Sequence, residues 1–189
     1  GFALLCSNSV QEVADLAGVA HLSAIKSGIP FLHFFDGFRT SHEVNTVELL
    51  DYSVFDKLLD KEAVAKFRAN ALNPAHPKTR GTAQNDDVYF QTRELQAQKY
   101  ETLYPIEEEY MNGISKATGR VYRPYQYFGA ADAERVIVLM GSACECAEEV
   151  VEHLTLKGEK VGMLKVHLYR PFVVEKFIEN AREFNVAVL

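Results

Sequence analysis

The 189-residue sequence has few of the features that mark secreted, membrane or nucleic-acid-binding proteins. Its three cysteines, Cys6, Cys144 and Cys146, are too few and too oddly numbered for a disulfide framework, which favours a reducing compartment. No apolar run approaches the roughly 18 residues that a membrane-spanning helix needs. The formal net charge is −6, whereas binders of phosphate backbones cluster Lys and Arg. We therefore expect neither a membrane segment nor a nucleic-acid partner.

Short motifs for cofactors and metals are also scarce. The sequence contains neither a Walker loop nor a dinucleotide fingerprint. Cys144 and Cys146 form the one close cysteine pair, but their spacing is shorter than metal sites use and no further ligand accompanies them. His33 and Asp36 lie near each other without a visible third ligand. We therefore expect no metal site in this chain.

Two stretches repeat the same order of strand, helix and strand. Residues 2–6 and 30–35 are apolar and flank a predicted helix that begins at Ser9 and ends at Gly28, with Ser9 and Glu12 as a capping box. The order recurs with strands at 135–140 and 160–168, a helix at 146–157 with Ser142 and Glu145 as its capping box, a helix from 171 to about 180, and a last strand at 186. Such alternation predicts an α/β fold with parallel sheets.

The segment from 41 to about 128 has a different composition, with more charge and no clear strand. It predicts a helix at 60–72, a loop at 73–82 and a long helical segment at 90–116 that Pro105 interrupts. The apolar stripe of that long segment is poor, so we expect the segment to wrap over a neighbouring surface as an excursion. The composition places a domain boundary near 130, with domains at 1–130 and 131–189.

Polar side chains follow the first two predicted strands. Ser7 and Asn8 lie beyond the first strand and at a helix N-terminus, where free N–H groups bind anions or polar ligands; simple helix capping is the favoured alternative, because no Gly-rich fingerprint is present. Beyond the second strand, Arg39 and His42 follow a Gly turn. Arg39 could hold a carboxylate or phosphate, or pair with Asp36 or Glu43 to fix the loop or seal a domain interface. These four residues are the candidate pocket or interface residues.

The run Phe34-Phe35-Asp36-Gly37-Phe38-Arg39-Thr40-Ser41-His42-Glu43 resembles the later part of domain I in the pyruvate:ferredoxin (flavodoxin) oxidoreductase family. Further colinear resemblances to domain I, its following excursion and the start of domain II extend across almost the whole chain, at 9–12, 19–22, 73–77, 80–85, 88–91, 132–138, 140–142, 157–162 and 168–172.

The resemblance implies an incomplete thiamine-diphosphate-binding-like domain I followed by the start of a transketolase C-terminal-like domain II. It also implies a homodimeric parent enzyme that converts pyruvate and CoA to acetyl-CoA and CO2 and passes electrons to ferredoxin or flavodoxin. Thiamine diphosphate, Mg2+ and iron-sulfur clusters would be the cofactors. The implied compartment is the cytoplasm, or a hydrogenosome-like organelle in an anaerobic eukaryote.

The sequence also departs from the family's pattern. It has no Gly-Asp-Gly with a downstream Asn, which would hold the Mg2+ and diphosphate, and no Cys-x-x-Cys runs. We therefore assign no catalytic residue and expect the cofactors to be bound mainly by parts outside this chain. The strand-like ends at Gly1 and Leu189 predict an internal fragment that is inactive alone. Another 2-oxoacid:ferredoxin oxidoreductase and a self-contained flavodoxin-like electron-transfer or binding module are the alternative interpretations.

Overall fold

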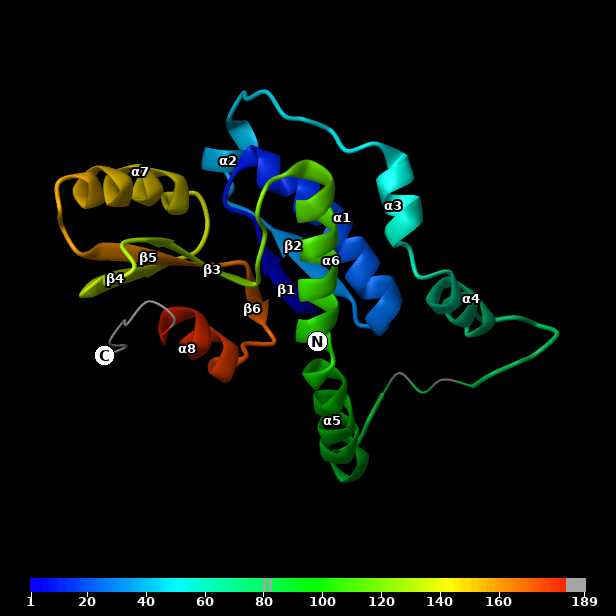
Figure 1. Ribbon diagram of the computed structural model, residues 1–189. Helices are drawn as coiled ribbons and strands as arrows, with labels where there is room; N and C mark the ends of the chain where they lie inside the picture. Colours follow the sequence, from blue (N-terminus) through cyan, green and yellow to red (C-terminus); the bar gives the residue numbers. More distant parts are fainter. Residues whose placement is uncertain (80, 82, 183–189) are drawn as a thin grey trace.

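Two small mixed sheets with helices packed on them form the body of the protein (Figure 1). The computed structural model describes residues 1–79, 81 and 83–182, so the strand expected at 186 lies outside the described residues. One sheet has the order β2-β1-β6 and the other the order β3-β5-β4. The strands are β1 (Ala3–Cys6), β2 (Phe31–Phe34), β3 (Tyr125–Gly129), β4 (Arg135–Leu139), β5 (Val161–Val166) and β6 (Leu168–Arg170). The helices are α1 (Val10–Ser27), α2 (Arg39–His42), α3 (Tyr52–Leu58), α4 (Lys61–Ala69), α5 (Asp86–Glu101), α6 (Leu103–Thr118), α7 (Ala143–Leu156) and α8 (Val174–Arg182).

The first strand-helix-strand unit forms as predicted. β1 and β2 pair in parallel, and α1 connects them. The Ser9 side chain accepts a hydrogen bond from the Glu12 N–H at 3.2 Å, and Gly28 ends the helix with a φ of 68°, a conformation that glycine adopts without strain. The capping box differs from the prediction in one contact, because the Glu12 carboxylate accepts from the Asn8 N–H at 2.7 Å. This shift directs Glu12 toward the other sheet.

The predicted long helix at 90–116 is two helices. α5 and α6 meet at Thr102, and Pro105 lies in the first turn of α6. Backbone N–H groups in the first turn of a helix have no intrahelical acceptor, so a proline there removes no helical hydrogen bond. α5 has no buried residue, which agrees with the poor apolar stripe. The expectation was wrong for α6, which packs Met111 and Ile114 against α1 in the largest hydrophobic cluster. The excursion therefore completes the core as well as covering it.

The second strand-helix-strand unit also forms, with two corrections. β4 and β5 are parallel and α7 connects them, but the predicted capping box is wrong because the Ser142 side chain makes no cap hydrogen bond. The segment 41–128 was expected to contain no clear strand, yet β3 begins at Tyr125 and pairs antiparallel with β5. Its aromatic side chains suit a pleated, half-buried surface, and Tyr125 is fully buried between α6 and α8.

The two sheets are connected by the chain and by hydrogen bonds. β6 follows β5 directly, but pairs antiparallel with β1 in the other sheet. The α/β class is confirmed, although each sheet has one antiparallel strand where only parallel strands were expected. A flavodoxin-like module has one continuous, mostly parallel sheet, so the described arrangement does not fit that alternative.

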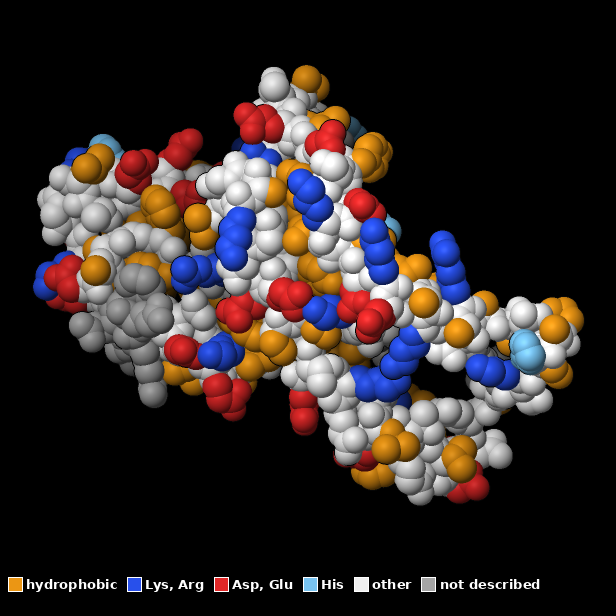
Figure 2. Space-filling view, turned by 45° about the vertical axis from the view of Figure 1, so that its right-hand side comes forward, with side chains coloured by type: hydrophobic (Ala, Val, Ile, Leu, Met, Phe, Trp, Pro, Cys, Tyr) orange, Lys and Arg blue, Asp and Glu red, His pale blue; other side chains and the backbone are white. Residues whose placement is uncertain are grey.

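Residues 70–79 and α5 extend away from this body (Figure 1), whereas α3 packs on α1 and α6. Figure 2 shows this projecting part on the right, with hydrophobic side chains on its surface. Phe67, Leu72 and Phe90 are each about 70% exposed, at 71%, 71% and 69%. Within the described part of the chain, no helix combines the length and apolar character that crossing a membrane requires.

Candidate site at the joint between the two sheets

The carboxyl ends of β1 and β2 meet the N-terminus of α7. Asn8, which follows β1, is fully buried, and its side-chain oxygen accepts a hydrogen bond from the Gly141 N–H at 2.6 Å. Asp36, which follows β2, accepts from the Ser142 N–H. The two side chains thus satisfy N–H groups at the start of α7 that no intrahelical carbonyl can reach. We call this arrangement the joint.

Glycine at 141 is required by this arrangement. Its φ is 85°, in the left-handed region, and a Cβ atom added there would collide with the Asp36 carboxylate. The hydrogen bonds from Ser142 hold the pKa of Asp36 below its ordinary value. Gly141 therefore lets a carboxylate that follows the first sheet approach a helix of the second.

A buried ionic network lies beside these contacts. Glu12 of α1 accepts from Lys165 of β5 at 3.3 Å, and Lys165 also contacts Glu148 of α7 at 2.5 Å. The side chains of Glu12 and Lys165 are only 10% and 8% exposed. Glu12 also lies 3.2 Å from Nε2 of the fully buried His167. The network therefore connects α1 with β5, α7 and the segment between β5 and β6.

The hydrogen-bond geometry fixes where a proton lies in this network. Nδ1 of His167 is 2.8 Å from the Arg123 carbonyl oxygen, which can only accept, so Nδ1 carries a proton. Nε2 faces the carboxylate of Glu12, which accepts unless it is itself protonated. A further proton therefore lies between His167 and Glu12, and the contact is charge-assisted.

The charges around Glu12 outweigh its burial. Burial alone would raise the pKa of Glu12, but His167, Lys165 and the Asn8 N–H together lower it to about 2. Burial would likewise lower the pKa of Lys165, yet Glu12 and Glu148 raise it. Both groups are therefore charged at neutral pH, and losing either partner would leave an uncompensated buried charge.

Ser7 lies in the same joint. Its hydroxyl is 2.6 Å from Nε2 of His33, and burial, with a contribution from His21, lowers the pKa of His33. Ser7 is fully buried, so a substrate has no access to its hydroxyl in this arrangement. Ser7 thus contacts the neighbouring strand of its own sheet, whereas Asn8 contacts Gly141 of the other region.

The structure places Arg39 and His42 apart from Ser7 and Asn8, on the short exposed helix α2. Among the described residues, Arg39 has no ion pair, so the pairing with Asp36 or Glu43 that the sequence offered is not formed. Residues 37–39 form a tight turn in which the Arg39 N–H donates a hydrogen bond to the Gly37 carbonyl oxygen at 2.8 Å. The central residue of this turn, Phe38, has a φ of 67°. This strained turn presents Phe38, which is 83% exposed, beside His42.

The described residues do not assemble a site for the cofactors that the resemblance implies. Cys6 and Cys144 are buried and Cys146 is exposed, and burial raises the pKa of both buried thiols to about 12. No group of three or more His, Cys, Asp or Glu side chains among the described residues is arranged for a metal ion. Ser7 and Asn8 are enclosed at the end of β1, so a diphosphate would not fit beside them.

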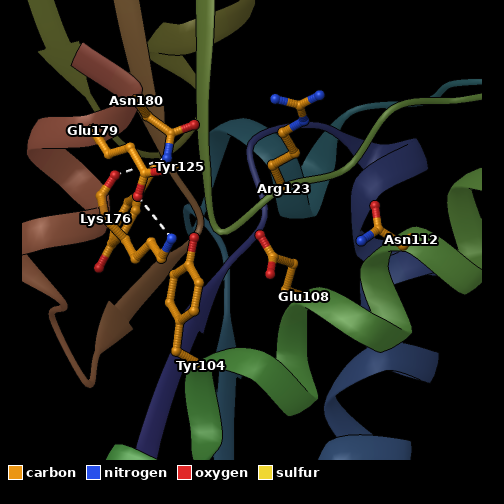
Figure 3. A pocket seen from close by; sticks show the side chains of 8 residues that line it. All are labelled: Tyr104, Glu108, Asn112, Arg123, Tyr125, Lys176, Glu179 and Asn180. Carbon is orange, nitrogen blue, oxygen red and sulfur yellow. Dashed lines mark hydrogen bonds and ion pairs between the residues drawn. The ribbon is translucent and has the colours of Figure 1, made fainter. Parts of the chain in front are cut away.

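A separate polar pocket of about 270 Å3 lies between α6, β3 and α8 (Figure 3). Two cations, Arg123 and Lys176, and two anions, Glu108 and Glu179, line it together with Tyr104, Asn112, Tyr125 and Asn180. Lys176 and Glu179 form an ion pair of 2.7 Å one turn apart on α8. Figure 3 shows the Arg123 guanidinium pointing away from Glu108. The lining thus carries two formal charges of each sign.

Comparison with known families assigns the chain. A family profile described as pyruvate flavodoxin/ferredoxin oxidoreductase, thiamine diphosphate-binding, matches residues 1–112. The chain belongs to this oxidoreductase family. A second profile, pyruvate:ferredoxin oxidoreductase core domain II, matches residues 133–189. The joint therefore connects a region of the thiamine-diphosphate-binding type with a region of the domain II type, as the resemblance implied.

Curated relatives of the oxidoreductase family match nearly the whole chain. A pyruvate-flavodoxin oxidoreductase of Enterobacter agglomerans is 54% identical over 100% of this chain and 16% of that protein's length. One of Klebsiella pneumoniae is 56% identical over 94% of this chain and 15% of its own length. A pyruvate:ferredoxin oxidoreductase of Moorella thermoacetica is 54% identical over 95% of this chain and 15% of that protein's length. The chain thus spans about a sixth of the length of these relatives.

Sequence reasoning missed most of the ionic network. Lys165 stands inside the otherwise apolar strand Val161–Val166, and a single lysine in such a strand needs a buried carboxylate partner. That signal was available, but it does not say which acid is the partner. Glu12 was assigned only to a capping box, although its carboxylate reaches Lys165 and His167, which are more than 150 residues away in sequence.

Proposed function

We propose that this chain acts within a pyruvate oxidoreductase that decarboxylates pyruvate oxidatively, with CoA, to acetyl-CoA and CO2 and passes the electrons to ferredoxin or flavodoxin. The observation that carries the proposal is the colinear match of two adjacent family profiles, at 1–112 and 133–189. Thiamine diphosphate, Mg2+ and iron-sulfur clusters would be held mainly by other parts of such an enzyme. The closest competing function is oxidation of a different 2-oxoacid by the same type of enzyme.

Within that enzyme, the role of this chain is to hold two domains in a fixed relation. We place the domains at 1–130 and 131–189, and β3, just before this division, pairs with β5 after it. The contacts of Asn8, Asp36 and Glu12 with α7 and β5 supply the rigidity. A reaction that builds charge on a bound substrate benefits from groups that are held in place before the reaction begins.

The direct test is an exchange of segments. The matching segment of the Klebsiella pneumoniae relative is replaced by this chain, and pyruvate- and CoA-dependent reduction of flavodoxin is measured. We expect the activity of the chimera to lie within about tenfold of that of the unaltered relative. A tenfold change in rate corresponds to only about 1.4 kcal/mol of activation free energy. A folded, cofactor-loaded chimera without activity on pyruvate would contradict the proposal. Activity on another 2-oxoacid in its place would favour the competing function.

A variant at Arg39 tests whether the exposed turn contributes to activity or stability. We propose that the Arg39 turn, together with His42, organises either the substrate pocket or a contact with another domain, because Arg39 has no ion-pair partner among the described residues and follows a strained turn. Arg39→Ala in the chimera is expected to weaken pyruvate affinity or turnover, or to lower thermal stability. If affinity, turnover and stability all stay unchanged, both roles are excluded. Arg68→Ala, on exposed helix α4, is the control.

The assembly and the compartment are further parts of the proposal. A homodimer is expected, because the segment from α3 to α5 exposes several large apolar side chains that a second subunit would cover. The expected compartment is the cytoplasm, or a hydrogenosome-like organelle in an anaerobic eukaryote. Light scattering of the chimera measures the dimer directly.

A further inference from the structure

A second polar pocket, of about 270 Å3, lies between α5 and the end of β6. Its lining consists of Arg93, Gln96, Ala97, Tyr100, Arg170 and Pro171. No acid lines it, in contrast to the pocket of Figure 3, whose lining includes two glutamates. Both charged side chains of this second pocket are therefore positive, in a chain whose formal net charge is −6. We call it the arginine pocket.

The helical period of α5 brings its four lining residues together. Gln96, Ala97 and Tyr100 follow Arg93 at the spacings that place residues on one side of a helix. Arg93, Gln96 and Tyr100 are half-buried, whereas Leu95 points away and is 65% exposed. The side of α5 that faces β6 thus carries polar and positive groups, where a helix that only packs would carry apolar ones.

Neither arginine has an acidic partner among the described residues. The Arg170 guanidinium lies over the Tyr100 ring, 5.2 Å from its centroid. The Arg93 guanidinium donates a hydrogen bond to the side-chain oxygen of Gln96 at 2.7 Å. Burial, and then the charges of Arg93 and Arg170, lower the pKa of the Gly1 amino group, so the local potential is positive. The two guanidinium groups are held in place, while no described carboxylate compensates their charge.

The polar side chains of the arginine pocket are left chiefly as donors. A guanidinium has no acceptor, so the atom of Gln96 that faces Arg93 is its oxygen. The NH2 group of the Gln96 amide therefore remains for a ligand. The Tyr100 hydroxyl donates to the Gly1 carbonyl oxygen, which directs it toward the backbone. The ligand that suits such a lining accepts hydrogen bonds and carries negative charge.

The charge of the pocket favours a phosphate group over a carboxylate. Guanidinium groups bind both kinds of oxyanion through paired N–H···O bonds. A carboxylate carries a single negative charge, whereas a phosphate monoester carries about two at neutral pH and matches two arginines. Ala97, Pro171 and the Tyr100 ring form the apolar part of the lining, against which an organic group can pack.

We propose that the arginine pocket binds a phosphate monoester, with Arg93 and Arg170 on the phosphate oxygens and the organic group of the ester against Tyr100 and Pro171. This site shares no residue with the joint or with the pocket of Figure 3. It is a second binding site on the chain, independent of the proposed oxidoreductase function.

Titration of the 189-residue chain with three probes tests the ligand class. Inorganic phosphate, phenyl phosphate and acetate are added at pH 7.5 and constant ionic strength, because salt screens exposed charges. The Nε–Hε NMR signals of the arginines report binding. We expect saturable shifts at Arg93 and Arg170 with phosphate, and binding of phenyl phosphate at least about threefold tighter. No saturable shift at either arginine, acetate binding as tightly as phosphate, or phenyl phosphate binding no tighter than inorganic phosphate would overturn the proposal.

Variants at Arg93 test the site itself. Arg93→Gln should weaken phosphate binding by about tenfold or more, because it removes a hydrogen bond to a charged group. α5 has no buried residue, so this change does not disturb the core. Arg93→Lys keeps the charge without the planar fork and should recover part of the loss. Arg68→Gln, exposed on α4, is the control and should bind as the unaltered chain does. Equal affinities of Arg93→Gln and this control would overturn the proposal.

Arg170→Gln tests the second arginine and should weaken phosphate binding by a similar factor. Unaltered phosphate affinity in a folded Arg170→Gln chain would overturn the two-arginine site. Arg170 pairs with Leu4 in the sheet, so the fold of this variant is checked by circular dichroism. If it unfolds, the affinities of Arg93→Gln and Arg93→Lys decide between the outcomes given above.

Discussion

Two glutamates are buried in different regions of the molecule, and their surroundings give them opposite charge states. Glu12, at the joint, contacts Lys165, His167 and the Asn8 N–H, and its pKa falls to about 2. Glu107, between α6 and α1, is also fully buried, but neither of its oxygens has a hydrogen-bond partner among the described residues. Burial raises its pKa to about 8, and Ser23 of α1 opposes this rise only in part.

The comparison shows that burial alone does not decide the charge of a carboxylate. At pH 7 Glu12 is ionised and stabilises the joint through its partners, whereas Glu107 is mostly protonated and behaves as a polar group within the helix core. Stability should therefore depend on pH with opposite signs in the two regions. The following changes test that contrast.

Removal of the Glu12 charge should have the largest effect. Glu12→Gln leaves Lys165 and His167 buried with only Glu148 to compensate them, and loss of one partner of a buried ion pair costs about 3–5 kcal/mol. Denaturant unfolding of the chain at pH 7, followed by circular dichroism, measures this loss. Glu149→Gln, on the exposed side of α7, is the control. A variant as stable as that control would show that the network is not needed for the joint.

Acid should remove the same stabilisation gradually. The folded pKa of Glu12, about 2, lies below its ordinary value of 4.5, so its contribution is complete above pH 4.5 and is lost as the pH falls toward 2. Between pH 6 and pH 3 the stability gap between the unaltered chain and Glu12→Gln should narrow by about 2 kcal/mol. Unfolding curves at four or five pH values in this range measure the gap. A gap independent of pH would mean that Glu12 titrates normally in the folded chain.

The sequence predicted local structure better than it predicted these contacts. Helix α1 was placed correctly because Ser9 and Gly28 mark its ends within the chain itself. The partners of Asn8 and Asp36, by contrast, are 133 and 106 residues away, and no local pattern encodes such distances. β6 was not foreseen as a separate strand because its three residues are too few to show a period.

The site residues divide in the same way. Ser7 and Asn8 were recognised because they follow a predicted strand, which is a local signal. The contact of Asn8 with Gly141, by contrast, depends on how the two sheets pack. The unpaired state of Glu107 was equally hidden, because a glutamate one turn from other polar residues on a helix predicts an exposed face.

Neutralising Glu107 should change stability in the opposite direction from Glu12. Its folded pKa, about 8, lies above the ordinary 4.5, so stability is complete below pH 4.5 and is lost as the pH rises through 8. Glu107→Gln should therefore be more stable than the unaltered chain by about 1–3 kcal/mol at pH 9 and nearly equal to it at pH 5. Glu108→Gln, exposed on the same helix, is the control for unfolding at both pH values. Equal stability at pH 9 would mean that water or a partner reaches the Glu107 carboxylate.

Asp36 provides an intermediate case and the smallest expected effect. It is partly exposed, and its carboxylate accepts from the Ser142 N–H at the start of α7. Asp36→Ala removes this cap and should cost about 1 kcal/mol, while Asp36→Asn keeps an acceptor and should cost less. Hydrogen exchange of the first turn of α7 measures the local loss, with the neighbouring exposed Glu43→Ala as the control. Equal losses for Ala and Asn would show that the charge of Asp36 matters and the acceptor does not, which would make this contact electrostatic, like that of Glu12.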